Sequence, residues 1–287
     1  MNRWLLGARV RTLPAAAVPV ALGAAVGVGQ GCARWWTVAV ALLVGVSLQV
    51  GVNYANDYSD GVRGTDTVRV GPARLVGGGL AEARLVKRAA FIAFGVAAAA
   101  GLVLVVTTSW WLIGVGLASI LAGWFYTGGD HPYGYIGLGE LFVFVFFGLV
   151  ATVGTTFVLL QHVPAVAWGL ASIAGSLACA LLVVNNLRDI PGDQASGKRT
   201  LAVRIGDRNT RMLYYVLVGV SFALLVVVAI DRPLALMGLL GIAAAARPVR
   251  TVARGASGRE LIAVLAGTGR LQLVVGALTT LGTALSG

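Results

Sequence analysis

Acidic and amide side chains gather in two short segments of an otherwise apolar sequence. The first segment carries Asn53, Asn56, Asp57 and Asp60, in which each asparagine stands four residues before an aspartate. On a helix, this spacing places all four polar groups on one broad face. Asp66 follows in a glycine-bearing turn. The segment therefore predicts a cluster of oxygen ligands at the end of a helix.

The second segment repeats the pattern further along the chain. Asn185 and Asp189 again stand four residues apart. Pro191 predicts that the helix ends near Asp189, which would put Asp193 on the following turn. The basic residues that accompany this segment are Arg188, Lys198 and Arg199.

Two such clusters suggest a particular chemistry. Carboxylate and amide oxygens are hard ligands that suit Mg²⁺, which one or two carboxylates commonly share with phosphate oxygens. Two facing clusters could hold Mg²⁺ against one diphosphate, while arginine and lysine take the remaining charge. Such a site stabilises a departing diphosphate and lets its carbon–oxygen bond ionise. Solvated acids paired with loop arginines would explain one cluster, but two are harder to explain in this way. The predicted catalytic metal ligands are Asp57, Asp60, Asp189 and Asp193.

Long apolar runs must position these segments. Of the 287 residues, 58% are hydrophobic and 11% charged, whereas soluble domains average about 25% charged residues. A soluble globule could not bury so much apolar surface, but a bilayer solvates it. We predict an all-α, multi-pass membrane helical bundle of about nine transmembrane helices, in a single domain over residues 1–287. The predicted spans are 13–30, 36–57, 88–107, 110–127, 138–160, 164–187, 211–230, 233–249 and 265–285.

Charged residues are distributed unevenly between the two sides of this predicted bundle. With the amino terminus inside, 20 of the 22 basic residues and ten of the eleven acids fall on the inner side. The exceptions are Arg34, Arg232 and Asp231. The positive-inside rule then places the amino terminus and both acidic segments in the cytoplasm and the carboxyl terminus outside. The net charge of +11 faces the anionic inner leaflet and does not require a nucleic-acid partner.

The acidic segments end the second and sixth spans, four spans apart. This spacing suggests a diverged repeat, with helices 1–4 and 5–8 each carrying one acidic site, plus one further helix. Two residues near these ends have more than one interpretation. Tyr126 ends the fourth span as an interfacial aromatic residue or as a substrate-facing one. Glu140 begins the fifth span, where it could favour the helix start or take part in catalysis.

Cysteine and histidine offer no competing site. Cys32 and Cys179 form no CxxC pair, and neither His131 nor His162 has a second metal ligand nearby in sequence. A zinc site is therefore not expected, and both cysteines are interpreted as small apolar residues.

Several motifs together resemble the UbiA superfamily of intramembrane aromatic prenyltransferases, which carries aspartate-rich motifs after helices two and six. The matching stretches are Arg11-Thr-Leu-Pro14, Asn53 to Asp66 with Gly71-Pro-Ala-Arg74-Leu, Tyr126-Thr-Gly-Gly129, Tyr133 to Glu140, and Asn185 to Gly206. One superfamily feature is missing, because Asp130 stands where a lysine often follows the tyrosine by four residues. Lys198 or an arginine would have to take its place.

The resemblance implies a bacterial plasma-membrane enzyme of menaquinone biosynthesis that uses Mg²⁺. It would transfer a polyprenyl chain from polyprenyl diphosphate to 1,4-dihydroxy-2-naphthoate, with loss of CO₂ and diphosphate, and Tyr126 would join the catalytic aspartates. The acceptor could instead be another aromatic compound such as 4-hydroxybenzoate. The substrate-binding residues implied are Arg11, Asn53, Asn56, Arg63, Asp66, Glu140, Asn185, Arg188, Lys198 and Arg199.

Two other functional classes fit less well. A CDP-alcohol phosphotransferase would also be intramembrane and Mg²⁺-dependent, but its signature would need an Ala-Arg pair that does not follow Asp60 and Gly61. A transporter usually places ionisable groups near the membrane midplane, beside broken helices. Here the acids end helices on one side, which argues against a path through the protein.

Overall fold

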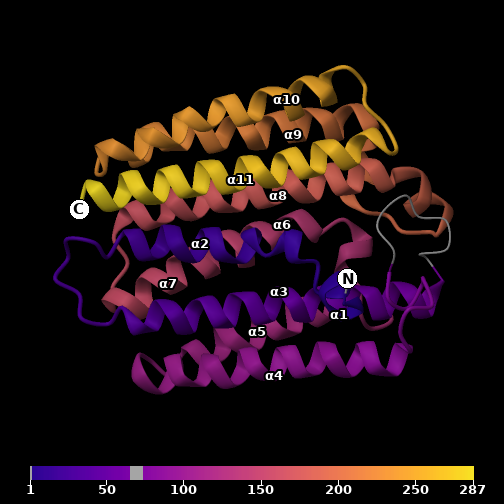
Figure 1. Ribbon diagram of the computed structural model, residues 1–287, viewed down its shortest axis with the longest axis horizontal. Helices are drawn as coiled ribbons and strands as arrows, with labels where there is room; N and C mark the ends of the chain where they lie inside the picture. The colour runs from indigo at the N-terminus through magenta and orange to yellow at the C-terminus, as the bar shows by residue number, and fades with distance from the viewer. Residues whose placement is uncertain (1, 65–73) are drawn as a thin grey trace.

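The computed structural model describes residues 2–64 and 74–287, and for Arg11 it describes the backbone only. Every regular element in this part of the chain is a helix, so the all-α prediction is confirmed (Figure 1). The elements of the amino-terminal half are α1 (Arg3–Ala8), η1 (Val10–Thr12), α2 (Pro14–Ala25), α3 (Trp36–Arg63), α4 (Ala83–Thr107), α5 (Leu112–Phe125) and η2 (Tyr133–Ile136). The remaining elements are α6 (Gly139–Val143), η3 (Phe144–Val150), α7 (Ala151–Leu160), α8 (Ala165–Ala195), α9 (Leu201–Val228), η4 (Pro233–Gly241), α10 (Ile242–Ala253) and α11 (Glu260–Leu285).

Each predicted apolar run falls on a helix, but the runs differ in length. Within the described residues, seven helical stretches are long and apolar enough to cross a membrane. In one of them, α6, η3 and α7 run together over Gly139–Leu160, with η3 forming a π-helical stretch. The runs predicted at 13–30 and 110–127 form the shorter helices α2 and α5.

The helix of the second acidic segment continues beyond the end that the sequence predicts. Pro191 lies inside α8, which ends at Ala195 rather than near Asp189. A proline removes only its own N–H bond and disturbs the carbonyl four residues earlier, so later N–H groups can still find partners. The N–H of Ser196 donates to the carbonyl of Gly192 at 3.0 Å. Asn185, Asp189 and Asp193 therefore follow one helix face at four-residue intervals.

Helix α8 forms the centre of the bundle. It packs against α9, η3, α11 and α2, and 72% of its apolar span is buried inside the protein. Figure 1 shows α8–α11 on one side and α3–α5 on the other, with α2, α6 and α7 between them. Close packing depends on small residues, because a Cβ placed on Gly148 of η3 would lie 2.6 Å from the Cα of Gly175 in α8.

Two arginines that precede α3 and η4 satisfy helix ends away from the acidic segments. Arg34 donates to the carbonyls of Thr107 at 2.9 Å and Val158 at 3.2 Å, near the carboxyl ends of α4 and α7. Arg232 donates to the carbonyl of Val26, just after α2, at 3.3 Å. A cation at a helix carboxyl terminus satisfies carbonyls that lack intrahelical partners and complements the helix dipole. These contacts explain why the two residues depart from the charge asymmetry.

Candidate active site

One cavity connects both acidic segments with the apolar interior of the bundle. Its volume is about 2230 Å³, and helices from both halves of the chain line it. The acidic end includes Asp57, Asp60, Asp189 and Asp193. The rest of the lining is mainly apolar and extends along α2, α3, α4, α5, η3 and α11. The cavity can therefore take a molecule with a charged head and a long apolar tail.

The aspartate pair that ends α3 is bound by other parts of the chain. Both oxygens of Asp57 accept backbone N–H bonds, from Leu75 and Val76, at 3.0 Å each. Oδ1 of Asp60 accepts from the Tyr135 hydroxyl at 2.6 Å and from Lys198 Nζ at 2.8 Å. The dipole at a helix carboxyl terminus disfavours carboxylates. These donors offset that cost and fix the orientation of both groups.

Residues of α8 itself bind the aspartate that follows Asn185. Arg188 donates to both oxygens of Asp189, at 2.7 and 2.8 Å, and to Asn185 Oδ1 at 2.8 Å. Asp193 accepts from the Thr200 hydroxyl at 3.3 Å, and its backbone carbonyl accepts the N–H of Lys198 at 2.8 Å. The turn after α8 is thereby tied to the helix that carries the second acidic segment.

Lys198 links the two halves of the acidic end. Besides its contact with Asp60, its ammonium lies 4.5 Å from the centre of the Tyr135 ring. Burial lowers the pKa of Lys198, but Asp60 and Tyr135 together outweigh burial and leave the pKa above its ordinary value. Burial and the Asp60 carboxylate raise the pKa of Tyr135, so its hydroxyl stays protonated and can donate. Lys198 thus places a positive charge at the acidic end of the cavity.

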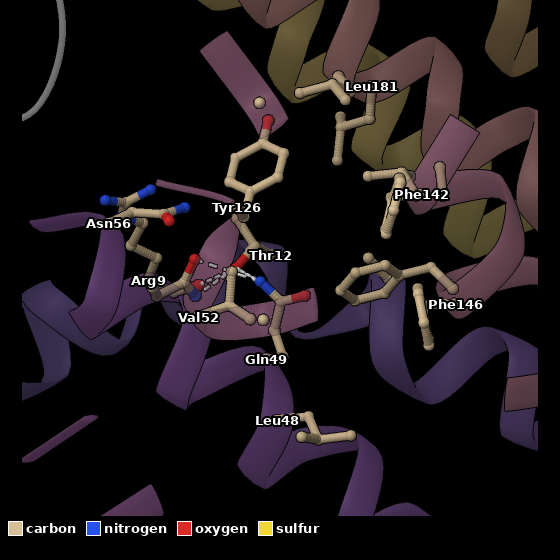
Figure 2. A pocket seen from close by; sticks show the side chains of 18 of the residues that line it. Arg9, Thr12, Leu48, Gln49, Val52, Asn56, Tyr126, Phe142, Phe146 and Leu181 are labelled. Carbon is tan, nitrogen blue, oxygen red and sulfur yellow. Dashed lines mark hydrogen bonds between the residues drawn. The ribbon is translucent and has the colours of Figure 1, made fainter. Parts of the chain in front are cut away.

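Tyr126, which follows α5 directly, lines the cavity near Phe142 and Phe146 (Figure 2). Glu140 is buried in α6, and its Oε1 accepts from Asn186 Nδ2 at 2.9 Å. Its Oε2 is also buried and has no hydrogen-bond partner. Asn186 lines the cavity beside Asn185. Glu140 is therefore connected to the cavity through its hydrogen bond with Asn186.

Polar side chains of α3 line another part of the cavity, where Figure 2 shows Gln49 and Asn56. Asn53 Nδ2 donates to the carbonyl of Ala8 and to the Thr12 hydroxyl, at 2.9 Å each. Gln49 Nε2 donates to Thr12 and Asn53 at 3.2 Å. Asn56 accepts from Thr127 at 2.8 Å. Both predicted asparagines of α3, Asn53 and Asn56, line the cavity.

Sequence reasoning missed several cavity residues. Gln49 precedes Asn53 by four residues, as Asn53 precedes Asp57, so the spacing carried a signal for it. Thr12 and Thr200 lie inside stretches that match the superfamily but have no helical spacing to the aspartates, and Arg9 had no comparable signal.

The remaining predicted site residues differ in their placement. Arg63 lines the cavity and donates to the carbonyls of Thr127 and Gly129. Arg199 is exposed at the surface, outside the cavity lining. The Arg11 side chain and Asp66 lie outside the described part of the structure.

The donor set at the acidic end suits Mg²⁺. Among the described residues, no three His, Cys, Asp or Glu side chains are close enough to form a metal site by themselves. Mg²⁺ needs no such cage, since it commonly takes one or two carboxylates and completes its shell with water and phosphate oxygens. The carboxylates of α3 and α8, which line the same cavity, fit that mode of binding.

Comparison with known proteins agrees with this architecture. Residues 16–263 match the model of the UbiA prenyltransferase family. A 1,4-dihydroxy-2-naphthoate octaprenyltransferase of Mycobacterium tuberculosis is 50% identical over 272 residues, which cover 95% of this chain and 93% of that protein. A protein of the same name from Escherichia coli is 40% identical over 217 residues, covering 72% of this chain and 70% of that one.

The fold is also similar to solved structures. The structure of a UbiA homolog from Archaeoglobus fulgidus bound to GPP and Mg²⁺ superimposes with a TM-score of 0.69 at 15% identity, covering 99% of this chain and all of that one. The fold and the family match define an integral membrane prenyltransferase. The chain belongs to the UbiA prenyltransferase family.

Proposed function

We propose that this enzyme transfers a polyprenyl chain from polyprenyl diphosphate to 1,4-dihydroxy-2-naphthoate and serves menaquinone biosynthesis. The observation that carries the proposal is the single cavity, which joins two carboxylate clusters to an apolar interior. The names of the relatives from Mycobacterium tuberculosis and Escherichia coli support the acceptor.

The acidic end would bind the diphosphate of the donor. Asp57, Asp60, Asp189 and Asp193 would hold Mg²⁺, which supplies positive charge to the leaving diphosphate when bound. Lys198 carries a positive charge beside Asp60 and would contact the phosphate oxygens directly. The other predicted binding residues, among them Asn53, Asn56, Arg63 and Asn185, line the same cavity and would orient these groups.

The apolar interior would bind the prenyl tail and exclude water. Cleavage of the allylic carbon–oxygen bond gives diphosphate and a carbon centre that water would quench. The electron-rich ring attacks this centre with the carbon that bears its carboxylate, so one carbon–carbon bond forms. The carbon–carboxylate bond then breaks, its electron pair restores the aromatic ring, and CO₂ leaves. No proton has to leave the ring, and the product is the demethylmenaquinol.

Tyr126 and Glu140 would act on the acceptor side of the cavity. Tyr126 stands in the aromatic wall, where its ring can pack against a flat substrate. Glu140 would act through Asn186, to which it is hydrogen-bonded. Both roles concern the position of the ring relative to the allylic carbon.

We also propose nine crossings of the bacterial plasma membrane, arranged as a 4+4 repeat plus one helix. The amino terminus and the acidic end would face the cytoplasm and the carboxyl terminus the outside. The contact of Gly287 with the segment after α2 supports this, because that segment lies at the end opposite α1. Labelling of single cysteines at positions 63, 198 and 287 tests it. Position 287 reacting only from the cytoplasmic side would remove one crossing.

An acceptor-competition assay tests the reaction. Purified enzyme in liposomes receives Mg²⁺, one polyprenyl diphosphate and equal amounts of 1,4-dihydroxy-2-naphthoate and 4-hydroxybenzoate. We expect prenylated naphthalenediol with one CO₂ per product, and no product from the Asp60→Asn, Asp189→Asn double variant. Product from 4-hydroxybenzoate alone, without CO₂, would keep the prenyltransferase class and reject the naphthoate acceptor.

A further inference from the structure

Arg9 occupies an unusual position beside the cavity. It caps α1 with a left-handed backbone, at φ 51° and ψ 60°, and is one of two non-glycine residues with positive φ in the described chain. This conformation is uncommon for residues with a side chain, and strained positions often occur at functional sites. Arg9 lines the cavity, and its Nη2 atom is buried without a hydrogen-bond partner.

A buried guanidinium nitrogen without an acceptor is costly. Leaving a charged donor unsatisfied away from water costs more free energy than leaving a neutral donor unsatisfied. Such a donor at a substrate cavity indicates an anionic ligand that completes it. Arginine suits such an anion, because its planar fork matches two oxygens of a carboxylate or of a phosphate.

The groups around Arg9 indicate which kind of ligand would fit there. Thr12, Gln49 and Asn53 form an uncharged, hydrogen-bonded wall next to it. In Figure 2, Arg9 and Asn56 lie on the same side of the cavity, and Phe142 and Phe146 lie across from them. The rings of Phe142 and Phe146 are stacked with their centres 6.0 Å apart. An aromatic ring bearing one carboxylate and neutral hydroxyls would match this combination of walls.

The diphosphate is a less suitable partner for Arg9. Asn53 donates a hydrogen bond to the carbonyl of Ala8, next to Arg9, and lies four residues, or about 6 Å, deeper along α3 than Asp57. Lys198 already stands at the level of Asp60. Arg74 lines the cavity and directly precedes Leu75 and Val76, whose N–H groups donate to Asp57. Lys198 and Arg74 are therefore placed for the diphosphate, and Arg9 for the level below it.

We propose that Arg9 binds the carboxylate of the aromatic acceptor and makes the enzyme select acceptors that carry this group. The inference rests on the proposed prenyl transfer to a hydroxynaphthoate. The guanidinium contact forms on binding and persists while the new carbon–carbon bond forms. An interaction that is equal in the ground state and the transition state affects KM and leaves kcat nearly unchanged.

A matched pair of competitive inhibitors tests the proposal. The probes are 1-hydroxy-2-naphthoate and 1-naphthol, which differ only in the carboxylate, and each is titrated against 1,4-dihydroxy-2-naphthoate. In the native enzyme, the carboxylate probe should bind more tightly. In Arg9→Gln its inhibition constant should rise on the order of 10- to 100-fold, while that of 1-naphthol changes by less than about threefold.

Two further variants exclude a purely structural effect. Arg9→Lys keeps the charge and should restore part of the preference, and Arg250→Gln removes an exposed charge of α10 and should leave the preference intact. KM for polyprenyl diphosphate should stay constant in Arg9→Gln. An unchanged preference between the probes in a folded, active Arg9→Gln enzyme would overturn the proposal, as would a rise in the diphosphate KM alone. Absence of naphthoate turnover in the native enzyme would instead reject the proposed function.

Discussion

Both acidic segments carry predicted metal ligands, but the contacts that fix their side chains come from different parts of the chain. Asp57 and Asp60 of α3 are bound by donors from the following loop, from η2 and from the turn after α8. Asp189 of α8 is bound by Arg188 and Asn185 of its own helix. The first segment thus depends on long-range contacts, and the second is largely organised by local ones.

This difference shows how one cavity end is assembled from two halves of the chain. Asp60 and Lys198 are 138 residues apart and meet at 2.8 Å. Among the described residues, the second segment takes its contacts from α8 and the turn after it, whereas the first is complete only when α3 packs against the other half. Substitutions at the two segments should therefore have distinguishable effects.

The largest effect should follow the loss of either carboxylate charge. Asp60→Asn and Asp189→Asn should each lower turnover on the order of 100- to 1000-fold, because each removes charge stabilisation of the leaving diphosphate. Turnover is measured in liposomes, with the yield of folded, detergent-extracted protein as the control. Near-normal turnover of either variant without added divalent metal would reject its role as a metal ligand.

The next largest effect should follow the loss of Lys198, the cation that links the two halves of the acidic end. Lys198→Gln should raise KM for polyprenyl diphosphate about 10- to 100-fold, and Tyr135→Phe should raise it less. Because the pKa of Lys198 is raised, KM should stay flat as pH rises until the ordinary lysine range is passed. Initial rates over a pH series check both points. Equal effects of Lys198→Gln and Arg208→Gln, an exposed control, would contradict the assignment.

Much of this arrangement could be predicted from sequence, and the reasons are local. Each apolar run became a helix, and four-residue spacing put Asn185 and Asp189 on one face. The predicted helix end near Asp189 was wrong, because Pro191 removes only its own N–H bond and the N–H groups that follow it still find partners.

The rest depends on packing between distant segments. The partners of Asp57 and Asp60 come from loops whose sequences give no sign of where they fold. In the sequence, Arg9 is one of many basic residues. Its place at the cavity follows from the packing of α1 against α3.

A smaller, local effect should separate Asp57 of the first segment from Asp189 of the second. In Asp57→Asn, the side-chain NH₂ can no longer accept one of the two backbone N–H bonds from Leu75 and Val76. Amide hydrogen exchange at these two residues should accelerate about tenfold, as expected for loss of roughly 1.4 kcal/mol of local stability. Asp189→Asn serves as the comparison and should leave exchange there unchanged. Equal acceleration in both variants would remove the contrast between the segments.

The smallest expected effect concerns the edge of the second segment. Thr200→Val removes the hydroxyl that donates to Asp193 at 3.3 Å, a long and therefore weak bond. Turnover should fall by less than about fivefold, in line with a net contribution near 1 kcal/mol. A loss as large as that of Asp189→Asn would mean that Asp193 depends on this contact more than the geometry indicates.

The central claim is that both segments hold one diphosphate. Its most direct measurement is the Mg²⁺-dependent binding of a non-reactive polyprenyl thiodiphosphate to the native enzyme, to Asp60→Asn, to Asp189→Asn and to the double variant. If the two carboxylates serve one ligand, each single change should abolish most of the Mg²⁺-dependent gain in affinity, and the double change should cost little more than either. Binding energies that add independently, or Mg²⁺-dependent affinity that survives in either variant, would contradict a shared site.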